Sequence, residues 1–81
     1  MYADDESIRK RIEKDIDLFY KNIEPLNSAK IEGKAMLHII ELSKMYAKDS
    51  RSFLDKGDFY TAFASINYAH GLLDAVREII K

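Results

Sequence analysis

The chain has 81 residues, of which 47% are hydrophobic and 33% charged, with a net charge of -1 and no cysteine. These values predict one folded domain and exclude a disordered chain, disulfide bonds and thiolate metal sites. The charge is too balanced to attract nucleic acid, and no apolar run is long enough to span a membrane. Because the N-terminus is acidic rather than signal-like, we expect a soluble cytoplasmic protein.

The first predicted helix covers residues 4–24. Its start is acidic, which suits the positive end of a helix dipole. Apolar residues then recur at helical spacing, at Ile8, Ile12, Ile16, Phe19 and Ile23. Pro25 disfavours helical backbone at the preceding residue, so the helix is expected to end there. The basic stretch from Arg9 to Lys14 is interpreted as a solvated face or, alternatively, a phosphate-binding patch.

The second predicted helix covers residues 28–56, with Asn27 or Ser28 as its N-cap. One apolar line is formed by Ile31, Ala35, Ile39, Leu42 and Tyr46. It is joined by further apolar residues, at Met36, Ile40, Met45, Ala47, Phe53 and Leu54. Asp49 and Ser50 interrupt this line. Because a buried lone carboxylate is costly, we expect Asp49 to be paired or to reach solvent.

A tight turn separates the second helix from the third, which is predicted over residues 58–80. Gly57 can adopt the left-handed conformation that ends a helix, and Asp58 can then cap the next one. So short a connection makes the two helices antiparallel neighbours.

Two lines of apolar or small residues run along the third helix. The line expected to be buried consists of Phe59, Ala62, Ile66, Ala69, Leu73, Val76 and Ile80. The second line consists of Ala64, Tyr68, Gly71 and Ala75, and we interpret it as a helix–helix or dimer face. Glycine inside a helix costs about 1 kcal/mol against alanine, which close packing at Gly71 would offset.

Polar residues at the margin of these lines form the candidate site: Tyr46, Asp49, Asn67, His70 and Asp74. They are interpreted as a hydrogen-bond network between the second and third helices, in which Asp49 meets Asn67 or His70. One alternative is a binding site for a small ligand or anion. A metal or hydrolytic site is a further alternative, but neither a second nearby histidine nor a carboxylate array supports it.

The stretch from Gly57 to Ala75 resembles an archaeal family of short helical proteins. Its most specific part is the run Asn67-Tyr68-Ala69-His70-Gly71-Leu72-Leu73-Asp74. The family is catalogued only as a domain of unknown function, the three-hundred-and-fifty-seventh of that series. The resemblance implies a compact antiparallel helical bundle in archaeal cytoplasm, with no settled activity. Some family members carry the module beside a nucleotidyltransferase-like domain.

We therefore predict an all-α fold, an antiparallel three-helix bundle that forms a single domain over residues 1–81. The predicted function is that of a non-enzymatic interaction module, which binds a protein partner or a second copy of itself and needs neither cofactor nor metal. The alternative function is small-ligand or anion binding, accessory to nucleotide metabolism, at the edge formed by Asn67, His70 and Asp74. RNA binding is a third class, which requires a steep dependence on salt.

Overall fold

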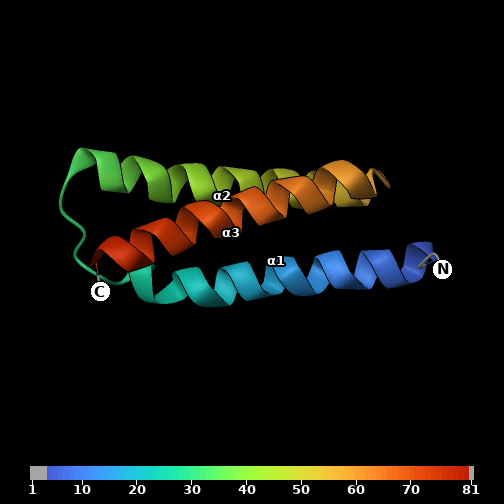
Figure 1. The fold of residues 1–81 in the computed structure, drawn as a ribbon, viewed down its shortest axis with the longest axis horizontal. Helices are drawn as coiled ribbons and strands as arrows, with labels where there is room; N and C mark the ends of the chain where they lie inside the picture. The colour runs from blue at the N-terminus through green and yellow to red at the C-terminus, as the bar shows by residue number, and fades with distance from the viewer. Residues whose placement is uncertain (1–3, 81) are drawn as a thin grey trace.

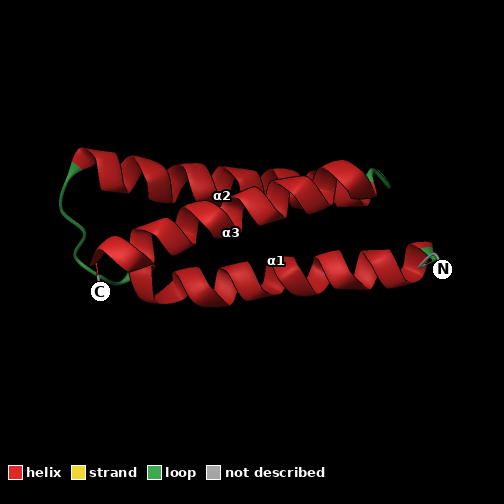
Figure 2. Cartoon of the chain, in the orientation of Figure 1, coloured by secondary structure: helices red, strands yellow, loops and turns green. Residues whose placement is uncertain are grey.

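Three long helices lie side by side in an elongated bundle (Figure 1). The computed structural model describes residues 4–80, and its helices are α1 (Asp5–Asn27), α2 (Lys34–Asp55) and α3 (Phe59–Ile80). Helices α1 and α3 run in the same direction and α2 runs opposite to both, within dimensions of 44 × 19 × 18 Å. Nearly all of the described chain is helical (Figure 2). The predicted all-α, three-helix bundle is confirmed.

All three helices contribute to the core, and in α1 and α3 the buried residues follow one stripe, as their apolar spacing predicts. The buried residues of α1 are Ile12, Ile16, Phe19 and Ile23, and those of α3 are Ala62, Ile66, Ala69, Leu73 and Val76. The ends of both predicted stripes are less buried, because there the neighbouring helices cover them incompletely: Ile8 and Phe59 are half-buried and Ile80 is exposed.

Helix α1 begins as predicted but ends later. The carboxylate of Asp4 caps it by accepting a hydrogen bond of 2.8 Å from the backbone N–H of Ser7, and this bond holds the pKa of Asp4 below its usual value. The predicted end at Glu24 is wrong, because Pro25 lies inside the last turn and the helix continues to Asn27. So close to the end, proline removes only one of the final backbone hydrogen bonds.

The start of α2 also differs from the prediction. Neither Asn27 nor Ser28 caps α2, since Asn27 is the last residue of α1 and Ser28 is its C-cap. The chain continues without helix to Gly33, which has a φ of 98° and precedes Lys34, the first residue of α2. That backbone conformation interrupts a right-handed helix, so the helix forms only after the glycine.

The turn between α2 and α3 agrees with the prediction. Gly57 has a φ of 82°, and its N–H donates to the carbonyl of Leu54 while the N–H of Asp58 donates to that of Phe53. This pair of bonds is the Schellman arrangement, which satisfies carbonyl groups at a helix end. Asp58 then caps α3 by accepting a hydrogen bond of 3.2 Å from the N–H of Thr61. The turn therefore holds α2 and α3 as an antiparallel pair.

The buried line of α2 agrees with the prediction only in part. It consists of Ile40, Ser43, Ala47, Ser50 and Leu54. Ile40, Ala47 and Leu54 are among the residues predicted to join the apolar line, whereas the main predicted line is half-buried or exposed. Small side chains at the centre of the buried line let α3 approach, and α2 and α3 pack more closely than any other pair of helices. Both serines are satisfied: the hydroxyl of Ser43 donates to the carbonyl of Ile40 at 2.7 Å, and that of Ser50 to the carbonyl of Ala62 at 2.6 Å.

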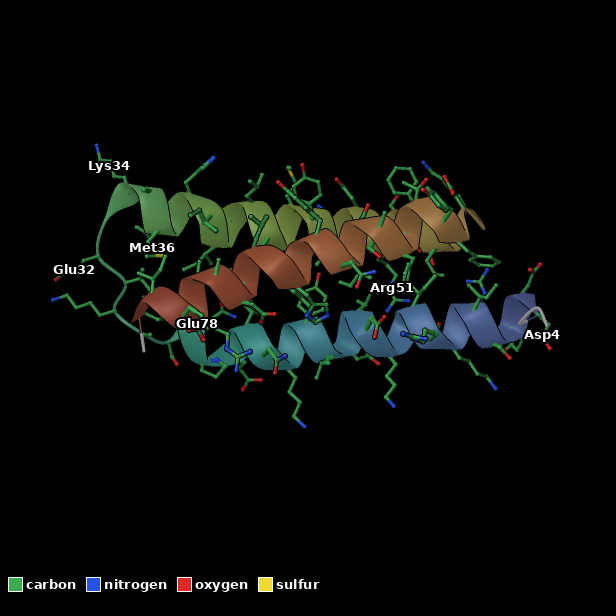
Figure 3. The ribbon with its side chains drawn as sticks, viewed as in Figure 1. Asp4, Glu32, Lys34, Met36, Arg51 and Glu78 are labelled. Carbon is green, nitrogen blue, oxygen red and sulfur yellow. The ribbon has the colours of Figure 1, made fainter. Side chains whose placement is uncertain are left out.

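Helix α1 is joined to the α2–α3 pair by fewer contacts. Arg51 of α2 extends toward α1 (Figure 3), where its guanidinium lies 3.8 Å from the carboxylate of Glu13. Both side chains are about two-fifths exposed, so this ion pair adds little stability. Burial of the α1 apolar stripe therefore supplies most of the attachment.

Candidate functional site

The five residues of the predicted polar cluster lie on two sides of α3. Tyr46 is half-buried on α2 and its ring packs edge to face against Tyr68, with centroids 4.6 Å apart and planes at 75°. Such pairs contribute about 0.5–1.5 kcal/mol beyond their buried area. Tyr46 therefore contacts the predicted dimer face rather than the rest of the polar cluster.

His70 faces α1, not α2. Its Nε2 lies 2.8 Å from the backbone carbonyl oxygen of Asp15, and its ring meets that of Phe19 at a centroid distance of 5.7 Å. A carbonyl oxygen can only accept a hydrogen bond, so Nε2 carries the proton and donates it. The half-buried imidazole thus joins the middle of α3 to the middle of α1.

The remaining cluster residues do not assemble around His70. Within residues 4–80, Asp49 makes no hydrogen bond or ion pair with Asn67 or His70, and it is half-buried at the side of α2. Asn67 is exposed. The carboxylate of Asp74 lies 3.7 Å from the guanidinium of Arg77, one turn along the same helix. The predicted network between α2 and α3 is therefore absent from the described residues.

We expect His70→Ala to lower the free energy of unfolding by about 1–3 kcal/mol, because it removes the hydrogen bond to Asp15 and the contact with Phe19. Asn67→Ala is the matched control, since Asn67 is exposed on the same helix and should change stability by less than about 0.5 kcal/mol. Urea denaturation of both variants measures the difference. Equal stability of the two would show that the hydrogen bond of His70 does not hold α1.

The predicted dimer face lies on the solvent side of α3. Ala64, Gly71 and Ala75 are exposed and Tyr68 is 52% exposed. A Cβ added at Gly71 would meet no atom of the neighbouring helices within 4 Å. Close packing inside the bundle therefore does not offset the cost of this glycine. Together with Tyr60 and Asn67, these residues form what we call the α3 outward face.

The α3 outward face lacks charge over most of its length. Residues 59–73 contain no Asp, Glu, Lys or Arg, although a third of the chain is charged. Tyr60 is 88% exposed and Phe63, beside it, is 40% exposed. Charged side chains dominate ordinary solvent faces, and aromatic residues are enriched where proteins bind one another. This surface has the composition of a binding interface.

A groove between the N-terminal ends of α1 and α3 is a second feature, which the sequence analysis missed. It has a volume of about 610 Å³, and its main lining residues are Ile8, Arg11, Ile12, Phe59, Tyr60 and Phe63. The available signal was the group of aromatic residues at the start of α3. The sequence alone did not place the basic stretch of α1 beside them.

Two kinds of site are not found in the described residues. Within residues 4–80, no three or more His, Asp or Glu side chains lie close enough together to hold a metal ion. None of the helices in that part of the chain combines the length and the apolar character needed to cross a bilayer.

Comparison with known families agrees with the resemblance found in the sequence. Residues 14–80 match the family described as "Protein of unknown function (DUF357)". This match covers most of the chain. The chain belongs to the DUF357 family. No curated protein matches it. The DUF357 match includes α2, α3 and most of α1, whereas Ile8 and Arg11 of the groove precede it. The family is an uncharacterised one, so membership assigns no activity, ligand or partner.

Proposed function

We propose that the protein is a non-enzymatic interaction module that binds a second copy of itself through the α3 outward face. The observation that carries this proposal is the uncharged, exposed stretch of α3 with Tyr60 and Tyr68 beside small residues. Small residues let two helix backbones approach closely, and the aromatic side chains supply most of the apolar area available for burial. Removing that area from water favours association.

The order of large and small residues fits an antiparallel pair of α3 helices related by a two-fold axis between Asn67 and Tyr68. In this register Tyr60 lies opposite Ala75 of the second copy, and Ala64 lies opposite its Gly71. Tyr60 then meets a small residue, Tyr68 lies opposite Asn67 of the second copy, and the same patch serves both copies, as a two-fold interface requires. A second copy of the chain can therefore cover the α3 outward face, and no different protein is needed.

The alternative function, ligand or anion binding at the edge of Asn67, His70 and Asp74, has weaker support. His70 donates to a backbone carbonyl of α1, and Asp74 lies beside Arg77. Neither group converges with Asn67 on a common point in the described structure. The self-association proposal needs no such convergence.

The test is sedimentation velocity from low micromolar to submillimolar concentration. We expect the wild type to approach the mass of a dimer as concentration rises. Ala64→Arg should weaken association by roughly a hundred-fold or more, because it places two unpaired charges in the interface. Ala35→Arg is the matched control: Ala35 is exposed on α2, outside the α3 outward face, so association should not change.

The antiparallel register has its own test. In the Ala64→Glu, Gly71→Lys double variant, opposite charges would meet across the two-fold axis, so association should recover relative to either single change. A wild type that stays monomeric at every concentration would refute self-association. A dimer that forms while the double variant remains monomeric would refute only this register.

A further inference from the structure

We propose that the groove between α1 and α3 binds a small amphiphilic anion, a molecule with an apolar body and one acidic head group. This inference does not rest on self-association. The groove of about 610 Å³ falls within the range of about 300–1,000 Å³ typical of small-molecule sites. Its floor is apolar, with Ile8 and Ile12 from α1 and Phe59 and Phe63 from α3. Such a lining favours burial of an aromatic or aliphatic body.

The groove is lined by one cationic side chain, that of Arg11, and by no carboxylate of the described residues. The guanidinium carbon of Arg11 lies 5.9 Å from the centre of the Phe63 ring, and that of Arg9 lies 5.2 Å from the centre of Phe59. Within residues 4–80 neither arginine forms an ion pair, whereas Arg51 pairs with Glu13. The ring contacts place the cations beside the groove without using their N–H donors.

Arg11 lines the groove and is exposed, so its N–H groups can bind an acidic head group while the body of the ligand enters. A guanidinium binds carboxylate, sulfonate and phosphate oxygens in the same two-pronged way. The hydroxyl of Tyr60, which also lines the groove, is a second donor. The combination of an apolar floor with the cationic donors of Arg11 favours an anion over a neutral polar molecule.

The length of the groove favours a small molecule over a docked helix. The lining residues span Ser7 to Ile12 on α1 and Phe59 to Phe63 on α3. At a rise of 1.5 Å per residue, each wall is about 6–8 Å long. A bound amphipathic helix places anchors over about two turns or more, which is a longer contact than these walls provide.

The test uses the aromatic sulfonate 8-anilinonaphthalene-1-sulfonate and its neutral analogue N-phenyl-1-naphthylamine, titrated by fluorescence. We expect the sulfonate to saturate one site per chain. Arg11→Gln should weaken its binding by about ten-fold and leave the neutral probe almost unchanged, because only the sulfonate uses the guanidinium. Arg77→Gln is the charge-matched control at the other end of α3, and it should change the affinity for neither probe.

Amide chemical shifts locate the bound probe independently of its fluorescence. We expect the largest shifts at Ser7, Ile8, Phe59 and Phe63, and the same affinity in the Ala64→Arg variant. Three results would overturn the proposal: no saturation, equal weakening by Arg11→Gln and Arg77→Gln, or loss of binding in Ala64→Arg. The last would place the probe on the α3 outward face. Because Ala64→Arg is expected to weaken self-association and to leave the groove unchanged, failure of one proposal is distinguishable from failure of the other.

Discussion

We expect Ile66→Ala to lower the free energy of unfolding by about 2–5 kcal/mol. Ile66 is 0% exposed at the centre of the α3 stripe, where it belongs to the same core cluster as Phe19 and Leu73. Removing its outer carbon atoms loses the transfer free energy of those groups and leaves a cavity that three rigid helices fill incompletely. A domain is stable by only about 5–15 kcal/mol, with small domains toward the lower end, so this loss is a large share.

Ile79→Ala is the matched control for this prediction. It makes the same change on the same helix, but Ile79 is 64% exposed and should cost less than about 0.5 kcal/mol. Ile66→Val, which removes one methyl group, should cost about 0.5–1.5 kcal/mol. Urea denaturation, read by circular dichroism, measures all three variants. Equal costs for Ile66→Ala and Ile79→Ala would mean that the α3 stripe is not the centre of the core.

The stripes of α1 and α3 were predictable because large apolar residues recur there at helical spacing with few polar interruptions. Any other packing of α1 and α3 would leave a broad apolar surface in water, formed by Ile12, Ile16, Ile66 and Leu73. The turn at Gly57 was predictable for a local reason. Glycine followed by Asp58 satisfies the end of one helix and the start of the next within adjacent residues.

Helix α2 was harder to predict because small side chains carry little periodic signal. Ser43 and Ser50 are buried with their hydroxyl groups bonded to backbone carbonyls, which a pattern of hydrophobic residues does not reveal. The predicted start of α2, at residue 28, was wrong for a different reason. The sequence contains helix-breaking signals at both Pro25 and Gly33, and only the backbone conformation shows that α1 continues past the proline and that α2 begins after the glycine.

Helical spacing alone does not show which neighbouring helix each residue of the candidate site contacts. Spacing gave the position of His70 at the margin of the buried stripe, but not which neighbouring helix covers that margin. The structure places α1 there, so His70 bonds to Asp15 rather than to any group of α2. For the same reason Arg11 and Phe63, remote in sequence, were not recognised as parts of one groove. Identifying such sites requires the arrangement of the helices.

The last prediction compares two alanines on opposite faces of α3. Ala69 is 0% exposed in the core, whereas Ala64 is exposed on the α3 outward face. We expect Ala69→Leu to lower the free energy of unfolding by about 1–3 kcal/mol, because a close-packed interior accepts added volume only by displacing its neighbours. Ala64→Leu adds the same volume at the same small cost in helix propensity, but into open space, so the stability of the single chain should change by less than about 0.5 kcal/mol.

The comparison must separate folding from self-association, because a dimer that binds only folded chains would add to the apparent stability. Both variants are therefore unfolded in urea at two protein concentrations. At the lower one sedimentation shows single chains, and the higher one is chosen to favour association. At the lower concentration, equal losses for Ala69→Leu and Ala64→Leu would mean that both alanines pack inside the bundle, and the α3 outward face would then not be available to a second copy. A loss confined to Ala69→Leu would leave the outward line free, as the proposed interface requires.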